Sequence, residues 1–446
     1  MTQTNHMTQS SHKHARSSEG FAGALLFTAT LLFYLVTLTP FIDLSAADAG
    51  AAATGKSNMI NQLVYLGLTA SLWWTVLNSP ARQLVGRPRT ILVALLVWFA
   101  IVSALSLHPD LALKRVFLAT LTIANGSVLL LLPRSERQFA SMLTFCCLGT
   151  LGLAYLGVAL LPHFAIHQAS EVREAMNAGL WRGHFAHKNV AAAAMVLISF
   201  VGLYLFSTGR RLVGTAMTLL AVVFLAQTGG KSAIAALPGI LVFAWIFERW
   251  RAVRAPMVIL AIAAFNIVTI GCAVSPTMRD LVAHLGVDPT FTNRIDIWKI
   301  GATAVMDNPL TGYGFQMFWQ TDDMVHKGGS AASWAYAAFN GHNAYLDAAV
   351  TTGIPGLVLT LIWVVWVPLR DVALAEASAN DPALTRLFVR IWLYGILMAC
   401  VESLFFQSGS LWFMLVVAIF GLHLQARAHE IRGAAHHSRG MEAVHA

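Results

Sequence analysis

Long apolar runs recur along the chain and are separated by short polar segments. A helix that spans a bilayer needs roughly 20 consecutive, mostly apolar residues. The segments that approach or reach this length are 21–44, 59–77, 91–107, 116–132, 140–161, 190–206, 213–227, 233–247, 256–274, 354–369, 387–405 and 411–424. The pattern predicts an all-α integral membrane protein with about 12 transmembrane helices.

The polar segments divide the chain into five parts. Residues 1–20 are polar, resemble no cleavable signal peptide, and are expected to form a disordered cytoplasmic tail. Residues 21–274 hold the first nine spans, and residues 354–424 hold the last three. Between them lies a large, partly helical loop, 275–353, and a second cytoplasmic tail follows at 425–446. Long loops of this kind commonly carry binding and catalytic residues.

Composition and charge agree with a membrane protein and indicate its orientation. Hydrophobic residues make up 57% of the chain and charged residues 11%, against roughly 25% charged residues in soluble domains. The net charge of +8 does not indicate nucleic-acid binding, because Lys and Arg concentrate in the segments on the side of both termini. This bias predicts an inner-membrane protein with both termini in the cytoplasm and the large loop facing outward.

Cysteine and acidic residues predict neither disulfides nor a metal. Cys146, Cys147, Cys272 and Cys400 all lie inside apolar runs, without metal-ligand spacing. The acidic residues of the large loop include no close-spaced pair that resembles a metal site. We therefore expect no metal and no cofactor.

The shorter outer loop ends in a dense group of cations and imidazoles. Residues 181–189 read WRGHFAHKN, in which Arg182, His187 and Lys188 precede an apolar helix. Arginine grips phosphate through two parallel hydrogen bonds and lysine acts as a point charge, so this group is a candidate anion site. The alternative is interfacial anchoring among lipid headgroups.

The large loop begins with a predicted amphipathic helix over 294–306, lying on the membrane or capping the bundle. Arg294 is a second candidate phosphate ligand, although a salt bridge to Asp296 or Asp307 would explain it equally. Trp298 and Tyr313 are candidates for a wall on which sugars stack, and local core packing is the alternative. The motifs NPLTG and GYGF that follow the helix indicate tight turns.

The large loop closes with the sequence GHNAYLD, which contains His342 and Asn343. An imidazole can accept a proton near neutral pH, which suits a general base acting on a sugar hydroxyl. A single histidine is more often structural. This one is followed at a fixed distance by Gly353 and Gly356 in the sequence GIPG.

His342-Asn343, nine intervening residues and then GIPG resemble the signature of the bacterial O-antigen ligase and polymerase superfamily. The stretches 292–319 and 182–189 also resemble this superfamily, especially its exopolysaccharide-polymerase branch. The resemblance covers roughly residues 170 to 370.

The resemblance implies a metal-independent, inverting membrane glycosyltransferase of the GT-C-like type. Such an enzyme takes a glycan from an undecaprenyl-diphosphate carrier on the periplasmic face. A polymerase passes it to another lipid-linked glycan, and a ligase passes it to lipid A–core. His342 would then be the base, and Arg294 and Arg182 would neutralise the leaving diphosphate. Lys188, His187, Asn343, Trp298 and Tyr313 would bind substrate, and the lipid tail would lie in a groove between helices.

Several functions stay open at this point. The sequence does not report the acceptor, so polymerase, ligase and transfer to a protein all remain, with the motif at Lys188 favouring a polymerase. A transporter is an alternative because Arg390 and Glu402 lie inside the predicted span 387–405, where charges often mark a transport pathway. A structural membrane scaffold would not need the loop motifs.

Overall fold

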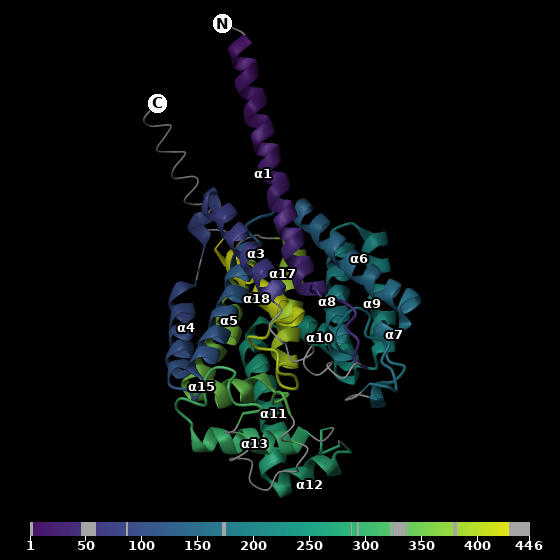
Figure 1. The fold of residues 1–446 in the computed structure, drawn as a ribbon, viewed down its shortest axis with the longest axis vertical. Helices are drawn as coiled ribbons and strands as arrows, with labels where there is room; N and C mark the ends of the chain where they lie inside the picture. Colours follow the sequence, from purple (N-terminus) through teal and green to yellow (C-terminus); the bar gives the residue numbers. More distant parts are fainter. Residues whose placement is uncertain are drawn as a thin grey trace. The chain divides into compact units, whose positions relative to one another are not determined.

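The computed structural model describes residues 3–45, 59–85, 88–171, 175–286, 288–291, 294–321, 324, 335, 338–377 and 381–427, with side chains from residue 20 onward. Within these ranges the regular structure is helical, apart from one isolated bridge between Ile166 and Trp181 (Figure 1). The helices on the predicted spans are α1 (Gln3–Val36), α3 (Met59–Leu77), α4 (Arg89–Ala104), α5 (Pro109–Leu129), α6 (Glu136–Leu160), α8 (Lys188–Ser207), α9 (Arg211–Thr228), α10 (Lys231–Arg249), α11 (Arg254–Val274), α15 (Ala344–Leu361), α16 (Val367–Ala377), α17 (Pro382–Met398) and α18 (Ser410–Ala426).

The prediction of an all-α, multi-pass membrane protein is confirmed. Each predicted apolar segment falls on a helix, and in the described part of the chain 7 helices are long and apolar enough to cross a membrane. They include α5, α6, α8, α9, α10 and α11, and the continuous segment Ala344–Glu376. Three shorter apolar helices lie at Gly20–Val36, Arg89–Ala104 and Ser410–Ala426. The number of crossings, about 12, stays a prediction.

The chain forms two compact units, each built from several stretches of sequence. Unit 1 comprises Met1–Gly86, Ala124–Pro238 and Gly409–Phe420. Unit 2 comprises Arg87–Ile123, Gly239–Ser408 and Gly421–Ala446. The candidate residues divide between them: Arg182, His187 and Lys188 belong to unit 1, and Arg294, Trp298, Tyr313, His342 and Asn343 belong to unit 2.

Unit 1 is organised around α8, in which most side chains are buried along most of the helix. α8 packs closely against α9 because glycines meet at the contact: a Cβ on Gly202 would lie 2.9 Å from the carbonyl oxygen of Gly214. Small residues let helix backbones approach in this way, which is how membrane helices gain packing energy without a hydrophobic driving force.

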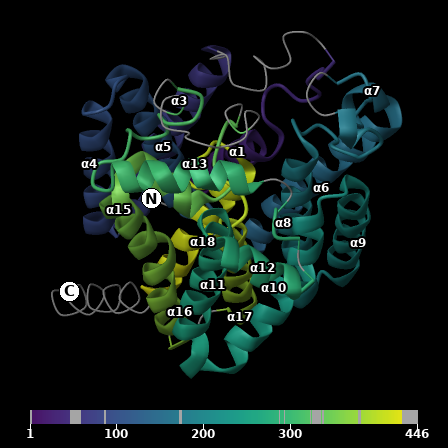
Figure 2. The ribbon, with the colours of Figure 1, turned by 90° about the horizontal axis from the view of Figure 1, so that it is seen from below.

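In unit 2, α13 (Arg294–Asp307) packs against α11 and α15. Figures 1 and 2 show α13 lying across the end of α11, beside the short helix α12 (Pro276–His284). Its buried face carries Ile297, Trp298 and Ile300. The predicted amphipathic helix over 294–306 is therefore confirmed, and it packs on unit 2 through its apolar side.

Three predicted boundaries differ from the structure. α15 begins at Ala344, before residue 354, because the side chain of Asn343 caps it by accepting the N–H groups of Tyr345 and Leu346, both at 3.0 Å. α17 ends at Met398, before residue 405, and the freed carbonyl of Ala399 accepts the N–H of Ala344 at 2.8 Å. α1 extends back to Gln3, and the disordered cytoplasmic tail over 1–20 stays a prediction. Residues 428–446 of the second tail lie outside the described residues.

The GIPG motif forms a kink inside α15. Gly353 has φ 68° and ψ 177°, a conformation that L side chains rarely adopt. The kink lets the turn after α13 dock on α15: Ile354 N–H donates to the carbonyl of Pro309 at 2.8 Å, and Tyr313 N–H donates to that of Val350 at 3.0 Å. The motif therefore joins the loop to the helix that follows His342.

Gly353→Ala is expected to destabilise unit 2 by several kcal/mol, because both backbone strain and a steric clash oppose it. The new Cβ would lie 2.0 Å from the carbonyl oxygen of Leu310. Gly239→Ala is the matched control, since nothing lies within 4 Å of its Cβ position. Thermal unfolding in detergent should show a clearly lower midpoint for Gly353→Ala alone, and equal midpoints for the two variants would contradict this account.

Candidate functional site

One partly exposed group of charges in unit 2 joins residues from three separate stretches of sequence. Arg294 Nη2 lies 3.0 Å from Glu402 Oε1, and His342 Nδ1 lies 3.5 Å from Glu402 Oε2. The side chains of Arg294, Glu402 and His342 are 19%, 26% and 35% exposed. We refer to these three residues as the charged triad. An imidazole, a guanidinium and a carboxylate are thus partly exposed side by side. Such a group could accept a proton from a substrate and stabilise negative charge on it.

Backbone contacts bring the triad together. Arg294 is the first residue of α13, His342 precedes the cap of α15, and Glu402 lies in the segment between α17 and α18. The bond from Ala344 N–H to the carbonyl of Ala399 joins the last two stretches, and Arg294 also donates to the carbonyl of Val401. The predicted salt bridge of Arg294 to Asp296 or Asp307 is therefore replaced by one to Glu402.

The position of Glu402 also bears on the predicted span 387–405. Because α17 ends at Met398, Glu402 lies outside the helix, and its side chain contacts Arg294 and His342. Burial alone would raise the pKa of Glu402, but the hydrogen bond with His342 and the charge of Arg294 outweigh it and lower that pKa below its ordinary value of 4.5. The carboxylate is thus charged throughout the physiological pH range.

The turn at Gly341 holds His342 in place. Trp298 Nε1 donates to the carbonyl of Gly341 at 2.8 Å, and the N–H of Gly341 donates to Asp347 Oδ1 at 2.9 Å. Trp319 Nε1 donates to the same oxygen at 2.7 Å. His342 itself has φ 47°, an uncommon conformation for a residue with a side chain. The surrounding bonds hold the backbone in this conformation and so fix the position from which the imidazole extends.

Trp298 and Tyr313 are placed in the core instead of on a surface. Trp298 is 0% exposed and Tyr313 9%, and both belong to one apolar cluster with Phe318 and Leu346. With little of either ring exposed, the predicted sugar-stacking wall gains no support from this placement and stays a prediction. In this structure the two residues contact the turn at Gly341 and the loop after α13.

Trp298→Phe tests this supporting role. Phenylalanine keeps most of the buried ring but removes the indole N–H, which leaves the carbonyl of Gly341 without that donor. We expect a loss of about 1–3 kcal/mol in unfolding free energy and slower turnover, with the affinity for the glycan unchanged. A loss confined to glycan affinity, at unchanged thermal stability, would support direct sugar binding instead.

Asn343 is fully buried, and its side chain connects two helices. Its Oδ1 caps α15, and its Nδ2 donates to Asn266 Oδ1 of α11 at 2.8 Å. Both ends of the amide are engaged, so the side chain joins the start of α15 to α11, and the predicted substrate-binding role of Asn343 stays a prediction.

A cavity of about 660 Å³ lies between α11, α13 and α15. Its lining is apolar except for Asn266 and the edge of Tyr345, and it extends along the helices past Leu361 to Trp366. Asn266 bonds to Asn343, so the cavity lies beside the residue that follows His342. A long apolar group could occupy it, as the predicted lipid groove requires.

The predicted anion site in unit 1 has a different character. Arg182 is 0% exposed and donates to the carbonyls of Phe185 at 3.1 Å and Ile42 at 2.6 Å. Burial lowers the pKa of Arg182, and the charges of Glu171 and Asp43 oppose that effect. Because the guanidinium is enclosed and bonded to backbone, a direct contact with a diphosphate does not fit this placement. Arg182 is best interpreted as a residue that shapes the loop.

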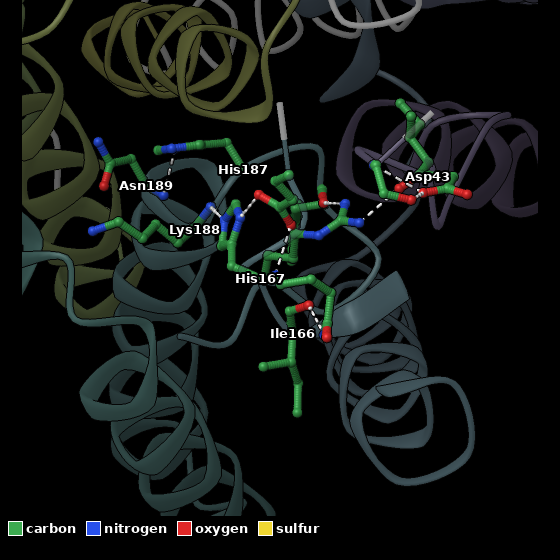
Figure 3. A network of polar contacts seen from close by, with 12 residues as sticks. Asp43, Ile166, His167, His187, Lys188 and Asn189 are labelled. Carbon is green, nitrogen blue, oxygen red and sulfur yellow. Dashed lines mark hydrogen bonds and ion pairs between the residues drawn. The ribbon is translucent and has the colours of Figure 1, made fainter. Parts of the chain in front are cut away.

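His167 and Glu171 form a buried pair beneath the first turn of α8 (Figure 3). His167 Nδ1 lies 2.7 Å from Glu171 Oε2, and the Nε2 atom accepts the N–H of Lys188 at 3.2 Å. His187 caps α8 by accepting the N–H of Asn189 at 3.1 Å. Figure 3 shows the side chain of Lys188 extending away from His167. Lys188 and His187 thus stay candidate ligands at a helix start, where the backbone dipole also favours anions.

Burial favours the neutral imidazole at His184 and His167. Burial lowers the pKa of His184 to about 4, against a smaller opposite effect of its bond to the carbonyl of Leu35. Burial also lowers the pKa of His167, and the Glu171 carboxylate opposes the change. A neutral His167 with its proton on Nδ1 can accept from Lys188, which agrees with the observed geometry.

The sequence identified most of the positions but missed several partners. Glu402 was noted only as a charge inside an apolar run, and Asp347, Asn266, His167 and Glu171 were not singled out. The pairing of Glu402 with a residue 60 positions earlier has no local signal. Within the described ranges, no group of three His, Cys, Asp or Glu side chains could hold a metal ion.

Comparisons with known proteins give one family match and one relative. The family model described as O-antigen ligase matches residues 214–361, which include α13 and His342 but neither Arg182 nor Glu402. The "Exopolysaccharide production protein ExoQ" of Rhizobium meliloti (strain 1021) is 33% identical over 87 residues, covering 18% of this chain and 19% of that protein. The match therefore spans about a fifth of that relative's length.

Proposed function

We propose that this chain, which carries an O-antigen ligase region and resembles the O-antigen ligase and exopolysaccharide polymerase superfamily, is a membrane glycosyltransferase. It would transfer a glycan from an undecaprenyl-diphosphate carrier to the end of another lipid-linked glycan, as a polymerase does. The observation that supports this most is the charged triad beside an apolar cavity: a base and a cation at the surface, next to space for a lipid.

The reaction assigns one task to each part. The acceptor hydroxyl gives its proton to Nε2 of His342, while Nδ1 faces Glu402. The hydroxyl oxygen forms a bond to the anomeric carbon as the bond from that carbon to the diphosphate breaks, which inverts the configuration. The electron pair leaves with the diphosphate, and Arg294 stabilises the developing charge. Since arginine supplies this charge, the proposal requires no divalent ion and no other cofactor.

The apolar cavity would hold the polyprenyl tail. Its lining from α11 and α15 offers hydrocarbon contacts, and one of its lining residues, Asn266, bonds to Asn343. A lipid bound there would have its diphosphate at the level of the triad. Lys188 and His187 are proposed to bind anionic groups of the substrate as well. The orientation proposed is that of the sequence analysis: inner membrane, triad facing the periplasm, both termini cytoplasmic.

A ligase that uses lipid A–core as acceptor is the second candidate, and the description of the matching family favours it. Both activities would use the same chemistry at the triad and differ only in the hydroxyl that attacks. The matching relative is named as an exopolysaccharide production protein, which favours the polymerase.

The test is transfer by the purified protein in detergent. A short glycan on undecaprenyl diphosphate is offered with the same lipid-linked glycan or with lipid A–core as acceptor, each with and without EDTA. Longer lipid-linked glycans in both conditions are the result expected for a polymerase. Product on lipid A–core alone would identify a ligase, and loss of product with EDTA would contradict the metal-independent mechanism.

A further inference from the structure

The two oxygens of Glu402 face residues with opposite tasks in the proposed reaction. Oε1 pairs with Arg294 at 3.0 Å, and Oε2 faces Nδ1 of His342 at 3.5 Å. One carboxylate therefore contacts both the cation proposed for the leaving group and the base proposed for the acceptor. A change in the contact with one partner therefore alters the strength of the carboxylate's interaction with the other.

The two contacts of Glu402 differ in length. A typical hydrogen bond from nitrogen to oxygen measures about 2.9–3.0 Å, so the bond to Arg294 is made and the one to His342 is at its limit. Catalytic hydrogen bonds are often long in a free enzyme and tighten when substrate binds. The bonds at Gly341 hold the backbone beside His342, so the contact closes by a small rotation of the Glu402 side chain or of the imidazole.

A bound diphosphate would compete with Glu402 for Arg294. It carries more negative charge than a carboxylate and accepts two parallel bonds from a guanidinium. A carboxylate that is only 26% exposed and loses its cation needs another donor, because burying an unpaired charge is costly. Nδ1 of His342 already faces it and can supply that donor when it carries the proton.

We propose that Glu402 is a positioning residue that exchanges partners when the donor binds. The diphosphate takes Arg294, and the carboxylate closes on Nδ1 of His342, which fixes the proton there and leaves the lone pair of Nε2 facing the acceptor. Donor binding thereby assembles the base. This inference rests on the proposed function, and it makes binding ordered, with the donor first.

The test compares Glu402→Gln with the wild-type chain in nanodiscs, using undecaprenyl diphosphate for binding and the lipid-linked glycan for transfer. The amide keeps the shape but loses the charge that competes for Arg294. We expect Glu402→Gln to bind undecaprenyl diphosphate roughly fivefold or more tightly while its kcat falls by about 100-fold. Glu402→Asp, which keeps the charge, should recover part of the kcat. A residue with a merely structural role would weaken binding and turnover together.

Glu376→Gln is the matched control, because Glu376 forms an ion pair with Arg254 in the same unit and lies outside the site. It should change neither binding nor kcat. In a chain that also carries Arg294→Ala, the tighter binding of Glu402→Gln should disappear. Weaker or unchanged binding by Glu402→Gln, at wild-type thermal stability, would overturn the exchange. A wild-type chain that neither binds undecaprenyl diphosphate nor transfers glycan would overturn the proposed function, and the exchange with it.

Discussion

His342→Ala should reduce glycosyl transfer by about 10²–10⁴-fold while leaving the affinity for the lipid-linked donor nearly unchanged. A positioned general base contributes a factor of this size, and the imidazole is the triad member to which the proposed reaction assigns the acceptor hydroxyl. Its side chain is 35% exposed, so its removal leaves little buried space and the fold should persist. Initial rates at saturating donor and acceptor, together with donor binding, measure both quantities.

A second histidine of the same unit separates chemistry from general damage. His284 lies in α12 and its Nδ1 contacts only the carbonyl of Asp280 among the bonds described. His284→Ala should transfer at the wild-type rate. Transfer by His342→Ala within about threefold of wild type would remove the base from the proposed mechanism, whatever the control shows.

Arg294→Ala is expected to lower kcat by about 10²–10³-fold, the cost of removing one group that stabilises charge in a transition state. It should also weaken donor binding, because the diphosphate loses its nearest guanidinium. Arg294→Lys should recover part of the rate but not all, since a lysine keeps the charge and loses the two parallel hydrogen bonds. The measurement is kcat and KM for the lipid-linked donor across the three chains.

The control for Arg294 is Arg251→Ala. Arg251 is 75% exposed and pairs with Glu376 in the same unit, so its removal should leave kcat unchanged. A donor KM that rises with no change in kcat for Arg294→Ala would mean that the residue binds ground state and transition state equally. That result would contradict its assignment to the leaving group.

The sequence sufficed for the helices because spanning a bilayer imposes a strong local signal. Apolar runs that approach or reach the length of a span marked each of the helices on the predicted spans, and the periodicity of 294–306 marked α13. His342 and Arg294 were predicted from motifs, and the structure brings them onto one carboxylate. Boundaries were less accurate, because the cap at Asn343 and the end of α17 depend on single hydrogen bonds that hydropathy does not register.

The partners of these residues could not be predicted, because long-range pairing leaves no periodic trace. Glu402 was interpreted as a membrane charge, and only the end of α17 at Met398 places it beside Arg294. Likewise, tryptophan is a residue type that commonly stacks on sugars, but the indole N–H of Trp298 donates to the carbonyl of Gly341 inside the fold. The burial of a particular side chain cannot be read from the sequence, which indicates burial only on average. For Trp298 it favours a supporting role over sugar binding.

The most direct test of the account follows bond cleavage in proteoliposomes that contain the purified chain and a labelled lipid-linked glycan. The account predicts one molecule of undecaprenyl diphosphate released for every glycosyl bond formed, with release lost in His342→Ala and Arg294→Ala. Movement of intact lipid-linked glycan across the bilayer without cleavage, unaffected by either substitution, would contradict it and indicate a transporter.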